Sequence, residues 1–537
     1  MCISNKSGSF GKGCKSNGRI TFLYQVLLFV VLLYRTDTFN STIKVGVLLM
    51  TNSTFPVDLL RIGPAVHMGV AEVKRRYGLE FQPLFRNYSV WCDRARVDAL
   101  GGLADMYYEE GVRAFIGPAC SYAVQSAGRM AQHLRVPMVT GLGDLVFRNP
   151  EVDAYDMFET TAILSYNTRK LSVSVRALLR DWKWSHVAII YDSFEVFYRE
   201  MAPAMIEDFK NDPDFPPLYP VKFERNKYWN AKDLLQDASA HARVFLMCVN
   251  ADEMRTILYQ AGMMGFGGEY VYIAIQLATI SWWGTYRKFL QNDMMDQTLK
   301  KVYENVLILE LINPVEDNGP FQDEIRDLAL NEFDYTFAEN ETVHYFIAAF
   351  YEAVLYLGAA YSKSIEETGS ADDGYAIART FFNNTFEGLN QSVAVDEEGT
   401  RIADFRVLDL LNADTEQWQV VGVFYGSKRA YEPKAGMTVR FPNGVPVDIP
   451  ACGFQGEHCI KKPLSAQTIV GIISGCLIVV LVLIIITQVI YSRRKANKDM
   501  RWRVSWRDVD VLKTKGSIIS GFSKSRISLE QEVGTKS

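Results

Sequence analysis

The chain has 537 residues, which at roughly 150 residues per domain predicts three or four folded units and excludes a minimal module. Its 57 Lys and Arg nearly balance its 62 Asp and Glu, giving a net charge of −5, so no basic field indicates a nucleic-acid partner. With 48% hydrophobic and 22% charged residues, most of the chain is expected to fold.

An apolar run near the N-terminus follows a stretch that contains several basic residues. Ile20 to Tyr34 has the length and the charge order of a secretory signal. We therefore expect residues 1–38 to be a cleaved signal peptide. An uncleaved signal anchor is the alternative, because residues 36–41 offer no small-x-small cleavage pattern.

A second apolar run, Thr468 to Tyr491, contains no charged side chain. At ~1.5 Å rise per residue it is long enough to cross a hydrocarbon core of ~30 Å as one helix. Four basic residues follow it, which places residues 492–537 in the cytosol as a short basic tail. We expect a single-pass plasma-membrane protein of type I, with its N-terminus extracellular and residues 451–467 as a juxtamembrane segment.

The glycosylation motifs agree with this orientation. The N-x-S/T motifs of the predicted acceptors lie between the two apolar runs, and none occurs after Tyr491. The predicted acceptors are Asn40, Asn52, Asn87, Asn340, Asn383 and Asn390.

Cysteine usage fits an oxidising exterior. Five cysteines lie between the apolar runs, and because five is odd, at least one is free or bonded to another chain. Cys452 and Cys459 flank a short loop beside the membrane, Cys92 and Cys120 bracket one helix and one strand, and Cys248 lies in an apolar strand.

Residues 39–450 alternate short β-rich runs with helical stretches, the pattern of parallel α/β sheets. A first doubly wound lobe is expected at about 43–145 and a second at about 150–310. A long helix near Val343 to Tyr361 and late strands around 405–411 and 419–425 should return to complete the two sheets. Two Rossmann-like lobes joined by several crossovers form a hinged cleft, as in type I periplasmic-binding-protein-like ectodomains.

Catalytic motifs are absent from the sequence. It has no GxGxxG after the first strand, no GxxxxGK[ST], no HExxH and no GxSxG, and its six His have no metal-ligand spacing. We therefore expect no metal site and no enzyme in the chain as it stands.

Several segments, taken in order, resemble one family, the natriuretic-peptide receptors and membrane receptor guanylate cyclases. The landmarks are RIGPAVHMGVAEVKRR (61–76), GPACSYAVQSAGRMAQHLRVPMVTGLGD (117–144), NNTFEG (383–388), DEEGTRIADFRVLDL (396–410) and DIPACGFQGEHC (448–459). The resemblance covers nearly the whole region between the apolar runs and continues past the second one.

The resemblance implies a pairing for four of the cysteines. Cys92 would pair with Cys120 in the first lobe, and Cys452 with Cys459 beside the membrane. Cys248 matches one half of a further family disulfide, whose partner would fall at residues 195–208. That stretch contains no Cys, so Cys248 is expected to be a buried free thiol.

The resemblance also implies binding residues near the first disulfide. A structural chloride would be held by the main-chain amides of Ala119 and Cys120 and by a nearby Ser, for which Ser89 is nearest, and no other cofactor is implied. A peptide-contacting aromatic falls on Tyr122, and an acidic ligand contact would fall near Asp93 or Arg94.

The tail distinguishes subgroups of this family. Residues 501–512 resemble the segment that opens the kinase-homology region of receptor cyclases, but only 46 residues follow Tyr491, too few for a kinase-like or cyclase domain. We expect a receptor for an extracellular peptide, acting as a homodimer or as a mixed dimer with a full-length cyclase. The alternatives are a fragment of a cyclic-GMP-producing receptor cyclase and a bilobal receptor for an amino acid or other small molecule.

Overall fold

The structure is a computed structural model, which describes residues 42–53, 56–88, 92–144, 158–277, 283–339, 341–459 and 466–500. The predicted signal peptide, Asn40, Ser89, Asn340 and the tail beyond residue 500 lie outside these ranges, and the side chains at 92 and 93 are not described. The chain up to His458 forms one compact unit, and a second unit begins at Cys459.

The first lobe is built on a five-stranded sheet with the strand order β2-β1-β3-β4-β5. Every neighbouring pair is parallel. Because β1 is buried on both faces it is a nearly continuous apolar run, as expected for the centre of a parallel sheet. The strands are β1 (Ile43–Met50), β2 (Phe81–Tyr88), β3 (Ala114–Ile116), β4 (Met138–Thr140) and β5 (Thr161–Ile163).

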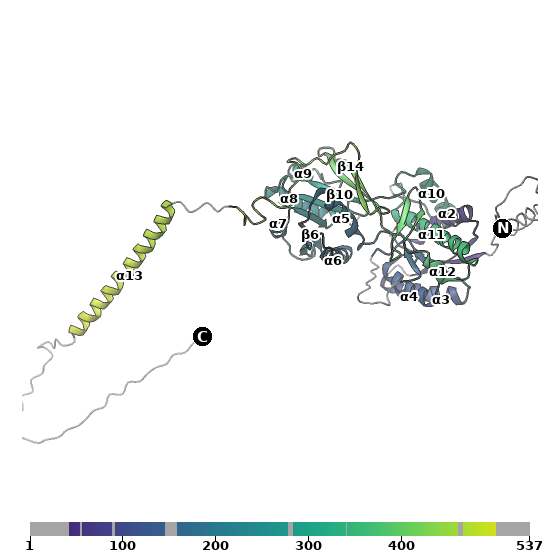
Figure 1. Cartoon of the computed structure of the whole chain (residues 1–537), viewed down its shortest axis with the longest axis horizontal. Helices are drawn as coiled ribbons and strands as arrows, with labels where there is room; N and C mark the ends of the chain where they lie inside the picture. The colour runs from purple at the N-terminus through teal and green to yellow at the C-terminus, as the bar shows by residue number, and fades with distance from the viewer. Residues whose placement is uncertain are drawn as a thin grey trace, which may run out of the picture. The chain divides into compact units, whose positions relative to one another are not determined.

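Six helices of the described residues pack in this lobe, and Figure 1 shows them together around its sheet. They are α2 (Leu59–Tyr77), α3 (Cys92–Tyr108), α4 (Ser121–Leu134), α10 (Gly319–Phe333), α11 (Tyr345–Thr368) and α12 (Gly374–Arg379). Asp58 caps α2 by accepting from the Leu60 amide at 3.0 Å. The helix α11 is buried along most of its length and packs closely against Gly69 of α2.

The second lobe has an eight-stranded sheet in the order β15-β14-β13-β10-β9-β8-β6-β7. Strands β6 to β10 are parallel, and β13 to β15 join as an antiparallel meander. The strands are β6 (Val187–Asp192), β7 (Tyr219–Phe223), β8 (Val244–Cys248), β9 (Val271–Gln276), β10 (Val306–Leu311), β13 (Phe405–Asn412), β14 (Gln417–Tyr425) and β15 (Ala430–Pro433). The helices are α5 (Leu171–Trp182), α6 (Val196–Lys210), α7 (Ala231–Ser239), α8 (Ala251–Met263) and α9 (Asp296–Tyr303).

The predicted α/β class with two parallel-sheet lobes is confirmed, but the predicted lobe boundaries need correction. Strand β5 belongs to the first sheet, so the first lobe extends to Ile163 rather than ending near 145. Strands β13 to β15 return to the second sheet beyond 310, as expected, but none of them joins the first sheet. A strand pattern shows which residues face the core but not which sheet they join. A further hairpin, β11 (Asn384–Glu387) with β12 (Ser392–Val395), forms a separate two-stranded sheet.

The second unit contains the helix α13 (Ala466–Met500). Among the described residues it is the one helix long and apolar enough to cross a membrane, over Gln467–Lys498. The run predicted from the sequence at 468–491 lies within it, and the helix continues through the basic residues that follow.

The chain crosses between the lobes three times, at residues 164–170, 312–318 and 396–404. Backbone hydrogen bonds join these crossovers near the sheets. Ile163 accepts from the amide of Arg401 and donates to Gly399, both at 2.8 Å, and Ile312 donates to Asp404 at 3.0 Å. The crossovers therefore form one hydrogen-bonded hinge.

A buried ion pair anchors the third crossover to α11. Arg401 donates to Glu352 at 2.5 Å, and the two side chains are 3% and 0% exposed. The second oxygen of Glu352 accepts from the Leu389 amide at 2.9 Å, and Arg401 also donates to the Leu164 carbonyl at 3.3 Å. Both charges therefore have hydrogen-bond partners, as burial of charge demands.

We predict that Arg401→Met lowers the free energy of unfolding by about 3–5 kcal/mol, because it leaves the Glu352 carboxylate buried without its counter-charge. The double variant Arg401→Met with Glu352→Leu should recover much of the loss, because no uncompensated charge remains. Chemical unfolding followed by fluorescence measures both.

A surface pair provides the control for this experiment. Lys428 and Glu432 pair at 2.6 Å with exposed side chains, so Glu432→Gln should leave the stability nearly unchanged. A loss of similar size in both single variants would contradict a special role for the buried pair.

Candidate functional site

The turn after β3 lies at the topological switch point of the first sheet, because β2 and β3 both flank β1. Ligands of open α/β sheets bind at the carboxyl edge at such points. Gly117 has φ of 91°, and a Cβ there would lie 2.3 Å from the Leu48 carbonyl oxygen, so the turn requires glycine. The carbonyl of Pro118 accepts from the hydroxyl of Thr140 at 2.7 Å, and the turn delivers Cys120 to the start of α4.

The Ala119 amide, predicted to hold chloride, has a protein partner. It donates to the hydroxyl of Tyr88 at 2.7 Å, and both residues are buried. Burial raises the pKa of Tyr88 well above its usual value, so this hydroxyl is neutral. The prediction that Ala119 contributes to a chloride site is therefore not supported by its geometry. Ser89 lies outside the described residues.

The cysteines follow the redox pattern expected from their spacing. Cys120, Cys452 and Cys459 are disulfide-bonded. The pairing of Cys92 with Cys120 and that of Cys452 with Cys459 stay predictions, since the side chain of Cys92 is not described. Cys248 is free and buried, which confirms the predicted free thiol, and its burial raises the pKa of the thiol.

Tyr122 lies half-buried in the first turn of α4. The guanidinium of Arg96, on the neighbouring helix α3, stacks 4.5 Å from the centre of its ring. Asp93 is three residues before Arg96 on α3, so both belong to the start of the helix that packs beside α4. Sequence reasoning missed Arg96, although its position one turn after the predicted acidic contact was a usable signal.

Four predicted glycosylation sites fall on the described surface. Asn52, Asn87, Asn383 and Asn390 are exposed, which suits a bulky modification, and glycosylation itself stays a prediction.

A pocket of about 570 Å³ lies where the two lobes meet. The second lobe contributes the ends of β9 and β10, and the first contributes α10 and the start of α11. Glu310 pairs with both Arg287 and Arg406, and Arg406 also pairs with Glu316 at 2.6 Å. These charges link β10, β13 and the second crossover around the pocket, and sequence reasoning missed them.

His344 caps α11 at the wall of this pocket. Its Nδ1 accepts from the Phe346 amide at 3.3 Å, which requires an unprotonated nitrogen. Burial lowers the pKa of His344 to about 4, so the ring is neutral at physiological pH.

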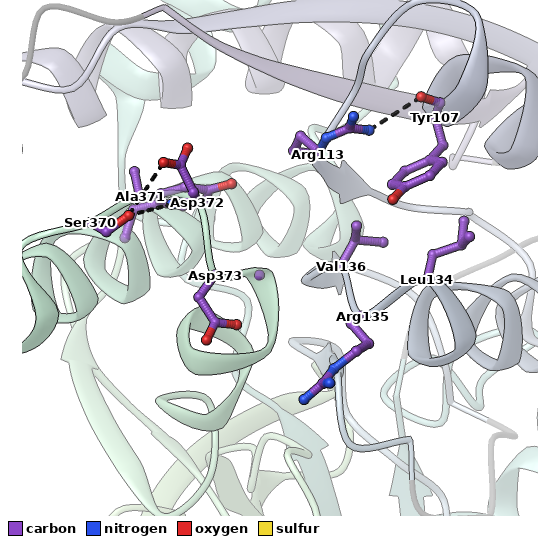
Figure 2. A pocket seen from close by; sticks show the side chains of 11 residues that line it. Tyr107, Arg113, Leu134, Arg135, Val136, Ser370, Ala371, Asp372 and Asp373 are labelled. Atoms are coloured by element: carbon purple, nitrogen blue, oxygen red, sulfur yellow. Dashed lines mark hydrogen bonds between the residues drawn. The ribbon is translucent and has the colours of Figure 1, made fainter.

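A second pocket, of about 540 Å³, belongs to the first lobe and is shown in Figure 2. Asp372 and Asp373 line one wall, and Arg113 and Arg135 line the opposite wall. Arg113 and Val136 precede β3 and β4, so this pocket lies at the amino edge of the sheet. Since ligands of such sheets bind at the carboxyl edge, we do not take it as the receptor site.

Hydrogen bonds fix residues 446–448, which precede the second unit, to the second lobe. Asp448 accepts four hydrogen bonds, from the amides of Ser185 and His186 and from both of their side chains, at 2.6–2.9 Å. Nearby, the Trp184 indole donates to the Pro446 carbonyl at 2.8 Å. We call these contacts the Asp448 latch.

No cluster of His, Cys, Asp or Glu that could hold a metal ion occurs within the described ranges.

The chain has two α/β lobes joined by a hinge. The carboxyl edge of the first sheet is the edge at which such sheets bind ligands, and a pocket lies between the lobes. These features define the chain as a bilobal binding protein. The chain belongs to the family described as the receptor family ligand binding region, which matches residues 61–412.

Known relatives carry receptor names. Atrial natriuretic peptide receptor 3 of Bos taurus is 25% identical over 453 residues, covering 81% of this chain and 82% of that receptor. The receptor-type guanylate cyclase gcy-28 of Caenorhabditis elegans is 23% identical over 524 residues, covering 86% of this chain and 40% of that cyclase. A solved structure titled a putative branched-chain amino acid ABC transporter from Rhodospirillum rubrum shares the fold, with a TM-score of 0.50, 12% identity, and coverage of 71% of this chain and all of that one.

The latch predicts a defined pH dependence. Partial burial raises the pKa of Asp448, but the hydrogen bonds from Ser185 and His186 outweigh it and leave the pKa below its usual value. The latch should therefore contribute stability fully above about pH 4 and lose it as the pH falls through the lowered pKa. Asp448→Asn should reduce the unfolding midpoint most at neutral pH, and its difference from the unmodified protein should shrink in acid.

Thermal unfolding between neutral and acidic pH measures this difference. Asp372→Asn, at an exposed position in the first lobe, is the control and should leave the pH profile unchanged. A constant difference between Asp448→Asn and the unmodified protein at every pH would contradict the latch.

Proposed function

We propose that the chain is a single-pass plasma-membrane receptor, with residues 39–467 outside the cell, that binds a peptide ligand. The observation that carries the proposal is a matched ligand-binding region over 61–412 in the same chain as one candidate membrane helix. Relatives named atrial natriuretic peptide receptors support a peptide rather than a small-molecule ligand.

The hinge supplies a physical mechanism for reception. A ligand held between the lobes, or between two protomers, shifts their relative orientation only if it binds one orientation more tightly than the other. The three hydrogen-bonded crossovers confine such a motion to a rotation about one region. The Asp448 latch makes the segment leading toward the membrane helix move with the second lobe.

We propose that the protein acts as a homodimer or as a mixed dimer with a full-length cyclase. In a mixed dimer, the ligand held by this chain would be read out by the cyclase of the partner. A second candidate is the ligand-binding part of a receptor guanylate cyclase, which the resemblance of residues 501–512 supports. The transcript sequence beyond the codon for Ser537 separates them, because continuation into a kinase-like reading frame favours the second candidate.

We predict saturable binding of atrial natriuretic peptide to intact, unpermeabilised cells that express the full chain. Tyr122→Ala should weaken binding about tenfold or more, because removing an aromatic anchor costs at least ~1.4 kcal/mol. Radioligand competition measures both, and intact cells report only sites that face outward.

The matched control is Tyr108→Ala, at an exposed tyrosine on the last turn of α3. This variant should bind like the unmodified protein. Saturable binding of free amino acids together with a complete lack of peptide binding would favour the small-molecule alternative and refute the peptide receptor.

A further inference from the structure

The turn at residues 117–120 is where the family resemblance implies a bound chloride, yet the Ala119 amide of this turn already has a protein partner. An anion there needs main-chain N–H donors, and the Ala119 amide points instead to the Tyr88 hydroxyl at 2.7 Å. Ala119 is 0% exposed and Tyr88 5%, so the contact is sealed from solvent.

The strand order explains how Tyr88 reaches the turn. Tyr88 is the last residue of β2 and pairs with Met50 at the end of β1, while the turn follows β3 on the other side of β1. The hydroxyl of a tyrosine, at the far end of a long rigid side chain, spans the end of the intervening strand.

A negative charge already occupies the neighbouring helix start. The hydroxyl of Ser121 donates to the carboxylate of Asp144 at 2.7 Å in the first turn of α4. A carboxylate at this end of a helix is favoured by the helix dipole, so a negative group already stands where an anion would be favoured.

We infer that the hydroxyl of Tyr88 replaces a chloride ion at the 117–120 turn, so that this protein folds independently of chloride. The inference goes beyond the proposed receptor function and does not rest on it, because stability alone reports the outcome.

The test compares thermal unfolding of the full chain in nanodiscs in sodium chloride and in sodium gluconate, each at about 0.15 M so that screening is equal. The unmodified protein should unfold at the same temperature in both salts. A midpoint several degrees higher in chloride would overturn the inference, because it would show an ion bound to the folded state.

The variant Tyr88→Ser removes the ring and exposes the Ala119 amide to a new cavity. Chloride binding to that amide should raise its midpoint by several degrees relative to gluconate. The matched control is Tyr356→Ser, which deletes an equally buried tyrosine whose hydroxyl donates to the Phe381 carbonyl. At that site the hydroxyl meets a main-chain carbonyl and the Asn384 side chain in place of a main-chain N–H, so the midpoint of Tyr356→Ser should be nearly the same in both salts.

A Tyr88→Ser variant that responds to chloride no more than Tyr356→Ser would overturn the inference. Tyr88→Phe keeps the ring and loses only the hydroxyl, so it should unfold at a lower temperature in both salts, since it leaves the Ala119 N–H buried and unpaired. A Tyr88→Phe protein as stable as the unmodified one would also contradict the inference, and this variant serves if Tyr88→Ser does not fold.

Discussion

The buried pair of Arg401 and Glu352 constrains the rest of the structure, because it fixes the third crossover against the central helix of the first lobe. Burying two charges is costly, and the cost is offset here by direct pairing and by backbone hydrogen bonds to Leu164 and Leu389. The crossovers can therefore bend only as a group. With a hinge of this kind, a single angle describes the relative position of the two lobes.

The interlobe pocket and the Asp448 latch both involve the second lobe. The charges of Glu310 and Arg406 bind the second crossover to the sheet of the second lobe. The Asp448 latch then binds the segment after β15 to the start of β6 in the same lobe. Rotation of the second lobe therefore carries the chain that leads to α13 with it.

More of the fold than of the candidate site could be predicted from the sequence. Apolar runs such as β1 and β6 predicted parallel strands because burial on both faces leaves a local signature. The membership of β5 and β13 was not predictable, because the sheet that a strand joins depends on contacts far away in the sequence.

The candidate site, too, could be predicted from the sequence only in part. The sequence pattern predicted a helix that starts near Tyr122, and the family resemblance implied the turn before it and the role of Tyr122. The partners of that turn were not predictable: Tyr88 and Arg96 approach it across neighbouring strands and helices. The resemblance implied Ser89 as a chloride contact, and this residue lies outside the described ranges.

The central claim is that the two lobes move as rigid bodies about the crossovers. Spin labels at Val97 and Met263, exposed on α3 and α8, report the distance between lobes, and labels at Val97 and Leu330 report a distance within the first lobe. The account predicts that atrial natriuretic peptide, once bound, shifts the first distance and leaves the second unchanged. An interlobe distance that stays the same with peptide bound, or an equal shift within one lobe, would contradict it.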